Sequence, residues 1–146
     1  MRNKLESLAK LGTVPYYMVL HCGGNDIGKH ALKSLRIVIF ELFQFITRKF
    51  PQTKVIWFQI LPRSQWRYSS DSNTMNHCRN RLNNFAAHKI VQSGGCYIRH
   101  PSLEIVTTSL YKTDCVHLSS VGNELFLNQL SAGIEAFVVH NVIFLP

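Results

Sequence analysis

Residues 16–28 read Tyr-Tyr-Met-Val-Leu-His-Cys-Gly-Gly-Asn-Asp-Ile-Gly, and this stretch decides the fold class. Its apolar side chains stand at successive rather than alternate positions, a pattern typical of a strand covered on both faces inside a parallel sheet. The strand runs directly into a Gly-Gly-Asn-Asp turn. In α/β folds, loops at the carboxyl ends of such strands form the crevice that holds ligands. We therefore expect the turn to lie at a functional site.

The residue types in this turn suit a chemical role. Gly23 and Gly24 allow a positive φ or a close backbone approach, and the side-chain amide of Asn25 can donate hydrogen bonds to a developing negative charge. A turn that only leads into the next helix uses the same residue types. The turn alone therefore leaves a catalytic and a purely structural interpretation open.

The remaining apolar patterns predict helices and strands in alternation. A short helix ends before Gly12 and Pro15, and the strand at 16–22 follows it. Further helices are expected at 31–49, 73–92 and 120–137, and further strands at 54–61 and 96–100. This alternation builds right-handed βαβ units and a parallel sheet. We expect one α/β domain over residues 1–137, and the apolar tail 138–146 has no pattern that assigns it.

Size and charge limit the classes of function. The chain has 146 residues, which is one domain's worth, and its 46% apolar and 16% charged residues are typical of a globular protein. Sixteen basic and eight acidic residues give a net charge of +8, which favours anionic partners such as nucleic acid. The basic residues form no run of five or six. A solvated basic surface is therefore the simpler interpretation.

The cysteines bear on metal binding, and the amino-terminal stretch bears on the location of the protein in the cell. Cys22, Cys78, Cys96 and Cys115 include no Cys-x-x-Cys pair, so we expect buried reduced thiols, no metal and no cofactor. A zinc site built from Cys22, Cys115 and His117 stays open, but no ligand-pair spacing supports it. Residues 1–10 are charged, which is unlike a secretory signal, and no stretch approaches the ~20 apolar residues of a membrane span. These features predict a soluble intracellular protein.

Asp114 and His117 stand just ahead of the last predicted helix. Their spacing lets the carboxylate hold one imidazole nitrogen while the other nitrogen stays free to accept a proton, as a general base requires. A helix-capping aspartate beside a surface histidine has the same spacing. The catalytic interpretation gains weight from position, because this pair and the turn at 23–26 would both face the crevice at the carboxyl ends of the strands.

Gly24-Asn25-Asp26 resembles the third conserved block of the SGNH hydrolases, also called GDSL-type esterases or lipases, and Asp114-Cys115-Val116-His117 resembles the fifth. The resemblance implies a flavodoxin-like, three-layer α/β/α sandwich. The stretch Arg63-Ser64-Gln65-Trp66-Arg67 is similar to a basic-aromatic loop in a metazoan branch of this family that is associated with mobile elements. The resemblance covers roughly residues 5–137.

The resemblance implies a role for each matching residue. His117 would be the base that activates the nucleophile, and Asp114 would orient it. Asn25 and Gly24 would form the oxyanion hole, and the substrate would be a small acyl ester. The crevice loop would comprise Arg63, Trp66 and Arg67, where the basic side chains could hold an anionic group.

The chain departs from the family's pattern at one block. Family members carry their nucleophile in a Gly-Asp-Ser block after the first strand, and this sequence contains no Gly-Asp-Ser. The resemblance therefore implies an amino-terminally truncated domain with its first strand missing and with little or no hydrolytic activity. Ser7, Ser119 and Ser120 lack a nucleophile's sequence context, and Cys22 and Cys115 are better explained as packed thiols.

Two other interpretations remain open. The chain could be a non-catalytic module that binds protein, or that binds nucleic acid through phosphate contacts and base stacking on the crevice loop. It could also fold poorly, because the loss of a central strand leaves an unpaired sheet edge.

Overall fold

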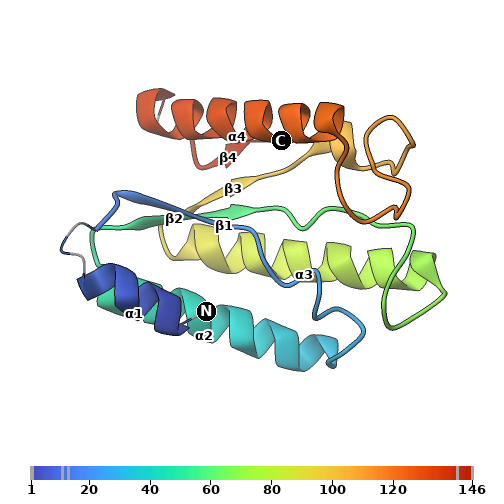
Figure 1. Ribbon diagram of the computed structural model, residues 1–146. Helices are drawn as coiled ribbons and strands as arrows, with labels where there is room; N and C mark the ends of the chain where they lie inside the picture. Colours follow the sequence, from blue (N-terminus) through green and yellow to red (C-terminus); the bar gives the residue numbers. More distant parts are fainter. Residues whose placement is uncertain (1, 11, 13, 141, 146) are drawn as a thin grey trace.

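The computed structural model describes residues 2–10, 12, 14–140 and 142–145. Helices and strands alternate along the chain (Figure 1). In chain order they are α1 (Arg2–Lys10), β1 (Tyr17–Leu20), α2 (Leu32–Lys49), β2 (Lys54–Phe58), α3 (Ser72–Gln92), β3 (Cys96–Ile98), the 3-10 helix η1 (Pro101–Leu103), α4 (Ser120–His140) and β4 (Phe144–Leu145). The predicted α/β class is confirmed.

The strands of the described residues form one parallel sheet in the order β1-β2-β3-β4. Leu20 of β1 stands opposite Trp57 of β2, and Phe58 of β2 stands opposite Ile98 of β3. Because the strands run in the same direction in this register, the loops that follow β1 and β2 leave the sheet at the same edge. This edge carries the candidate site.

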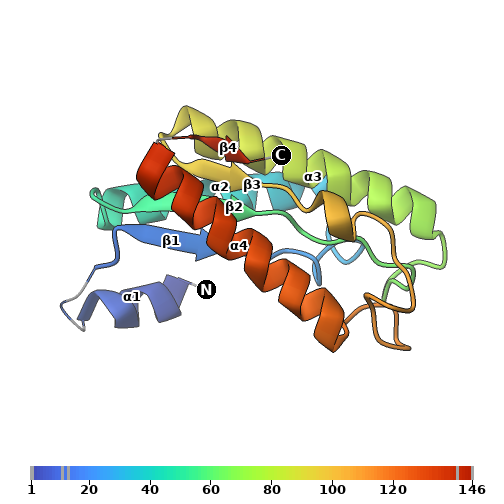
Figure 2. The ribbon, with the colours of Figure 1, turned by 90° about the horizontal axis from the view of Figure 1, so that it is seen from above.

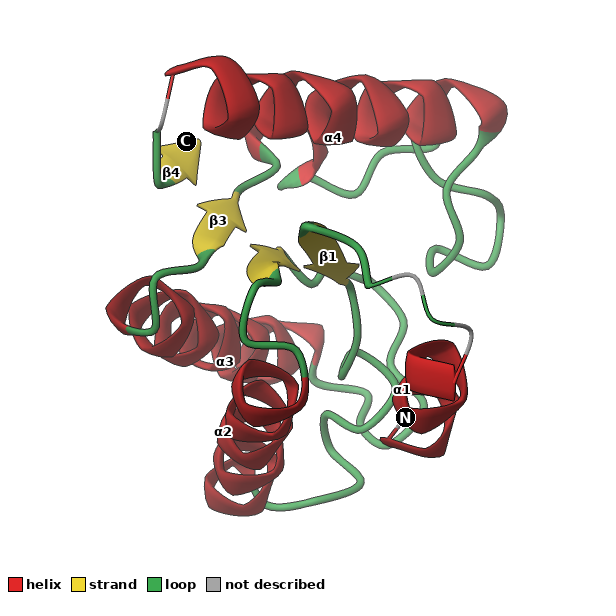
Figure 3. Cartoon of the chain, turned by 90° about the vertical axis from the view of Figure 1, so that its left-hand side faces the viewer, coloured by secondary structure: helices red, strands yellow, loops and turns green. Residues whose placement is uncertain are grey.

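Helices cover both faces of the sheet, which gives three layers. Figure 3 shows α2 and α3 on one face and α4 on the other, and in Figure 2 α4 lies across the strands. Val55 and Trp57 of β2 are buried, and Trp57 packs in the same cluster as Phe43 of α2, while Ile56 and Phe58 pack with Phe137 of α4. Adjacent residues of a strand point to opposite faces, so a run without polar residues is what a strand covered on both faces requires.

The ends of three strands and of one helix differ from the prediction. β1, β2 and β3 end at Leu20, Phe58 and Ile98, before the predicted ends of these strands. Helix α4 continues past residue 137 to His140, and the unassigned tail contributes the short strand β4, which pairs with β3. The residues beyond the early strand ends form the turns at the candidate site.

The buried face of α4 also differs from the predicted one. The spacing of apolar residues predicts a buried set of Leu125, Leu127, Leu130, Ile134 and Phe137, but the side chains of Leu125 and Leu127 are exposed. The other three pack against the sheet as expected, and Phe126 joins them, because these positions fall on one side of the helix. Within the described helices, none is long and apolar enough to cross a membrane.

A buried amide ties α3 to the end of β2. Asn83 Oδ1 accepts hydrogen bonds from Trp57 Nε1 at 3.3 Å and from the backbone N–H of Ile60 at 3.0 Å, and Asn83 Nδ2 donates to the carbonyl of Ile60 at 3.0 Å. The amide thus satisfies three buried groups at the point where the chain leaves the sheet.

We expect Asn83→Ala to lower the free energy of unfolding by about 2–4 kcal/mol, because each buried polar group left without a partner costs about 1–3 kcal/mol. The matched control is Asn84→Ala on the exposed side of the same helix. Urea denaturation of both variants measures the difference. Equal losses in the two variants would mean that the buried amide has no special role.

Candidate active site

The turn after β1 lies directly against the loop after β2. The backbone N–H of Asp26 donates to the carbonyl of Gly23 at 3.0 Å, and Gly23 has a φ of +96°, which favours glycine. A Cβ atom on Gly24 would lie 3.0 Å from Arg63 Nη2 and 3.2 Å from Ile60 Cγ2. A side chain at position 24 would push these neighbours away, so the glycine permits the close approach of the two loops.

The second predicted element is a tight loop before α4. Asp114 Oδ1 accepts hydrogen bonds from the backbone N–H groups of Val116 and His117, both at 2.9 Å, and Asp114 Oδ2 lies 2.7 Å from His117 Nδ1. The backbone N–H of Lys112 donates to the carbonyl of His117 at 2.8 Å and closes the loop. The carboxylate therefore fixes both the backbone and the ring of His117.

The Asp114–His117 pair is open to solvent. The side chains of His117 and Asp114 are 73% and 48% exposed. The hydrogen bond from the His117 ring, followed by the two backbone N–H groups, lowers the pKa of Asp114 well below its usual range. The carboxylate is thus ionised at neutral pH, and its contact with the His117 ring is made through Nδ1 and leaves Nε2 uninvolved.

One cleft of about 720 Å³ brings the predicted residues together. Its lining includes Gly24 and Asn25 from the loop after β1 and Asp114 and His117 from the loop before α4. All three residues of the predicted crevice loop, Arg63, Trp66 and Arg67, also line it. A smaller cavity of about 380 Å³ adjoins it around the turn that holds Asn25. The loops expected to converge at one sheet edge therefore do so.

The crevice loop is built around Trp66. The side chain of Trp66 is only 8% exposed, and its Nε1 donates to the carbonyl of Arg63 at 2.9 Å. Asn76 of α3 fixes Arg63 further, accepting its N–H at 3.3 Å and donating to its carbonyl at 2.8 Å. Because the indole is an anchor inside the loop, it offers no free face for stacking a nucleobase.

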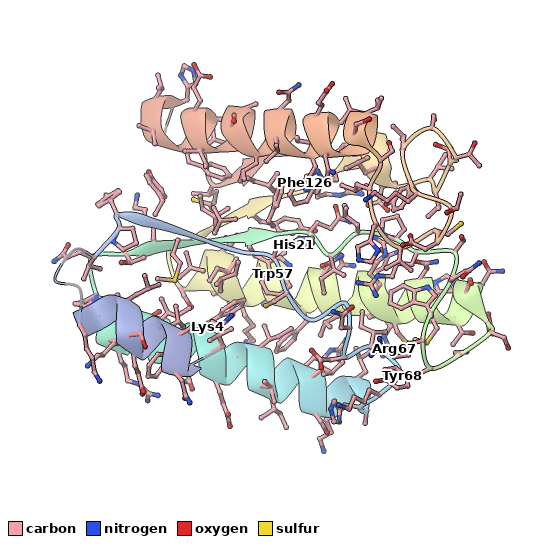
Figure 4. The ribbon with its side chains drawn as sticks, viewed as in Figure 1. Lys4, His21, Trp57, Arg67, Tyr68 and Phe126 are labelled. Carbon is pink, nitrogen blue, oxygen red and sulfur yellow. The ribbon has the colours of Figure 1, made fainter. Side chains whose placement is uncertain are left out.

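Aromatic side chains form the wall behind the cleft, and sequence reasoning missed one of them. Phe126 of α4 lines the cleft, and its ring centroid lies 5.2 Å from that of His21. Both side chains are labelled in Figure 4. His100 stacks on the other side of Phe126 at 5.0 Å and an interplanar angle of 9°. The spacing of Phe126 with Leu130 and Ile134 was the signal that could have identified this face.

His100 is fully buried at the end of β3. Its Nδ1 lies 2.8 Å from Gln129 Oε1, while its Nε2 has no hydrogen-bond partner among the described residues. Burial lowers the pKa of His100 to about 4, so the ring is neutral at pH 7. It supports the wall as a packing residue.

Other candidate nucleophiles and metal ligands are not assembled at the cleft. Burial, followed by the nearby charge of Asp26, raises the pKa of Cys22 to about 11, which makes it a poor nucleophile at neutral pH. Ser119 Oγ accepts the N–H of Gly122 at 3.1 Å and so caps α4. Among the residues that the structure describes, no three His, Cys, Asp or Glu side chains are grouped to hold a metal ion.

Comparison with known proteins identifies the fold. No protein-family model matches the chain, and no curated protein sequence matches it. Solved structures do match, and those described below are named as an acylhydrolase, a GDSL-like lipase and an esterase domain. The sandwich fold that the resemblance implied is thereby confirmed.

Three of these structures illustrate the likeness. A Bacteroides fragilis protein named as an acylhydrolase superposes with a TM-score of 0.73 at 18% identity, covering 91% of this chain and 66% of its own. The esterase domain of the ORF1 protein of the zebrafish retrotransposon ZfL2-1 has a TM-score of 0.61 at 23% identity, covering 80% and 67%. A Parabacteroides merdae protein named as a GDSL-like lipase has a TM-score of 0.63 at 14% identity, covering 82% and 60%.

These identities establish the fold, and activity does not follow from fold alone. The chain spans between 58% and 69% of the length of six of the structures it matches. The retrotransposon protein agrees with the predicted likeness to domains from mobile elements.

The geometry predicts the tautomer of His117. Since Asp114 accepts from Nδ1, neutral His117 should carry its proton on Nδ1 and leave Nε2 free. Ring ¹⁵N chemical shifts should show this state, and Asp114→Ala should shift the ring toward the Nε2–H form. Asp71→Ala, which removes the carboxylate that caps α3, is the control and should change nothing at His117. A wild-type ring already protonated on Nε2 would contradict this geometry.

Stability should fall in acid because of His100. Between about pH 6.5 and about pH 4 the unfolded chain binds a proton at this residue and the folded chain does not, so lowering the pH favours unfolding. The shift corresponds to about 3 kcal/mol. Between pH 7.5 and pH 4, the free energy of unfolding should fall by at least about 2 kcal/mol less in His100→Gln than in wild type. The control His77→Gln, at an exposed position, should lose the same free energy of unfolding as wild type. An equal loss in His100→Gln would mean that His100 does not cause the loss of stability in acid.

Proposed function

We propose that this chain carries the base and the oxyanion-binding half of an SGNH-type esterase site, directed at acyl esters. The observation that supports this most strongly is the cleft that Asn25 shares with the hydrogen-bonded Asp114–His117 pair. Its position at the carboxyl ends of parallel strands is where α/β folds bind ligands. The acylhydrolase and esterase names of the structural neighbours agree with this proposal.

Each residue has a stated role in the proposed reaction. His117 Nε2 removes the proton from the attacking oxygen, and Asp114 stabilises the imidazolium that forms. Attack on the ester carbonyl moves its electron pair onto the carbonyl oxygen. The side-chain amide of Asn25 and the backbone N–H of Gly24 donate hydrogen bonds to this oxyanion. Collapse of the intermediate expels the alcohol, which takes the proton from His117.

The attacking oxygen in this chain is proposed to come from water. The sequence contains no Gly-Asp-Ser, Cys22 has a raised pKa, and Ser119 is used as a helix cap. Loss of the nucleophile alone costs a serine hydrolase on the order of 10⁶-fold in kcat. The base and the amide of Asn25 therefore support only slow hydrolysis.

We expect slow hydrolysis of p-nitrophenyl acetate that depends on His117. His117→Ala removes the base and should reduce the rate to the background hydrolysis that other exposed side chains cause. The matched control is His77→Ala, which removes an exposed histidine of α3 and should keep the wild-type rate. Release of p-nitrophenolate, followed at pH 8, measures all three proteins.

Two results would contradict this proposal. Equal rates in wild type and His117→Ala would mean that the pair is not a catalytic base. A kcat in the ordinary enzyme range of about 1–10³ s⁻¹ that His117→Ala abolishes would mean that the chain supplies its own nucleophile.

Nucleic-acid binding and an intracellular location stay predictions. The net charge of +8 favours an anionic partner in general. The buried indole of Trp66 does not favour the stacking mode of binding.

A further inference from the structure

Arg63 is held in a fixed place above the floor of the cleft. Its backbone makes hydrogen bonds to Asn76 and accepts one from Trp66, so the loop cannot easily shift. The guanidinium carbon lies 5.4 Å from the centre of the Trp66 ring, and Nη2 approaches the backbone of Gly24. The guanidinium therefore lies between the indole and the turn that carries Asn25.

This charge has no counter-charge within the described part of the chain. Ion pairs there include Arg79 with Glu104, at 2.9 Å, and Asp114 with His117 when that ring is protonated, and neither involves Arg63. Arg79 offers a comparison within the same fold, because its buried guanidinium has a carboxylate partner. Arg63 is half-buried and receives none, and burial lowers its pKa. A cation that has lost part of its water without gaining an anionic partner is a ready binding group for an anion.

The rest of the cleft adds to this positive field. Arg67 also lines the cleft and is exposed. The one carboxylate among the lining residues is Asp114, whose oxygens already accept hydrogen bonds from His117 and Val116. A concave surface with basic groups and a satisfied acid concentrates anions from solution.

We propose that Arg63 binds a carboxylate or phosphate group carried by the ester substrate, so that the site selects anionic acyl esters over neutral ones. This proposal rests on the proposed function of the same cleft. The planar guanidinium matches either anion through two parallel N–H donors. Arg63 is thus a specificity residue and not part of the proton transfer, which His117 performs.

The test is a binding titration that needs no hydrolysis. Methyl phosphate and monomethyl succinate serve as the anionic probes, and methyl acetate is the neutral ester control. Amide and indole signals of ¹⁵N-labelled protein report binding, in particular Trp66 Nε1–H and the side-chain amide of Asn25. We expect saturable shifts with at least one of the two anions and none with methyl acetate at equal concentration.

Variants separate a specific site from general surface charge. Arg63→Gln should weaken anion binding at least about tenfold, the equivalent of one lost charge-assisted contact. The matched control is Arg48→Gln, which removes an exposed arginine at the end of α2, outside the cleft, and should keep wild-type affinity. Arg63→Lys keeps the charge without the planar fork and should fall between the two. Amide spectra of the variants check that each remains folded.

Each outcome decides the proposal. Saturable binding of one anion alone, lost in Arg63→Gln, supports it and names the carboxylate or the phosphate as the recognised group. Equal weakening in Arg63→Gln and Arg48→Gln would overturn it, as would the failure of both anions to bind. His117→Ala should bind the anions as wild type does. Failure of the ester hydrolysis test with retained anion binding would therefore overturn the esterase proposal alone.

Discussion

The parallel pairing of β1 with β2 is the constraint on which the rest of the site depends. Leu20 stands opposite Trp57, so the two strands end within one residue of each other and send their loops to one edge. A shift of one residue in a strand exchanges the side chains on its two faces. Such a shift would move Trp57 out of the cluster beneath α2 and α3 and would separate Gly24 from Arg63. The buried core and the cleft are thus fixed by the same register.

A polar network then holds the chain after it leaves β2. Asn83 satisfies both backbone groups of Ile60, and Arg79 donates to the same carbonyl at 3.0 Å while it pairs with Glu104. Gln59 links Glu104 to the backbone N–H of His100. Buried polar groups of this kind specify one arrangement, because each is costly to leave without a partner. The position of Arg63 over the cleft follows from this support on α3.

The sequence predicted the parts of the site that depend on local patterns. Uninterrupted apolar runs identified the strands, and the spacing of Asp114 and His117 predicted their hydrogen bond. The glycine at 24 predicted a close approach, although not that Arg63 would make it. Phe126 and the burial of Trp66 depend on contacts between distant elements, to which a single sequence gives no direct access. The predicted strand ends were wrong because a run of apolar residues can continue past the last hydrogen bond of the sheet into a buried turn.

The exposure of the cleft residues separates rate from recognition in this chain. Asp114 and His117 lie largely in water, where electrostatic interactions are weak, so the proposed proton-transfer pair gains little from its surroundings. Arg63 is partly removed from water, and a charge in that setting interacts more strongly with an incoming anion. Under the two proposals, binding free energy would therefore come mainly from the crevice loop, and chemical activation would come mainly from the loop before α4. An arrangement of this kind can retain selectivity for a substrate class even when its catalytic rate is low, because the two properties depend on different residues.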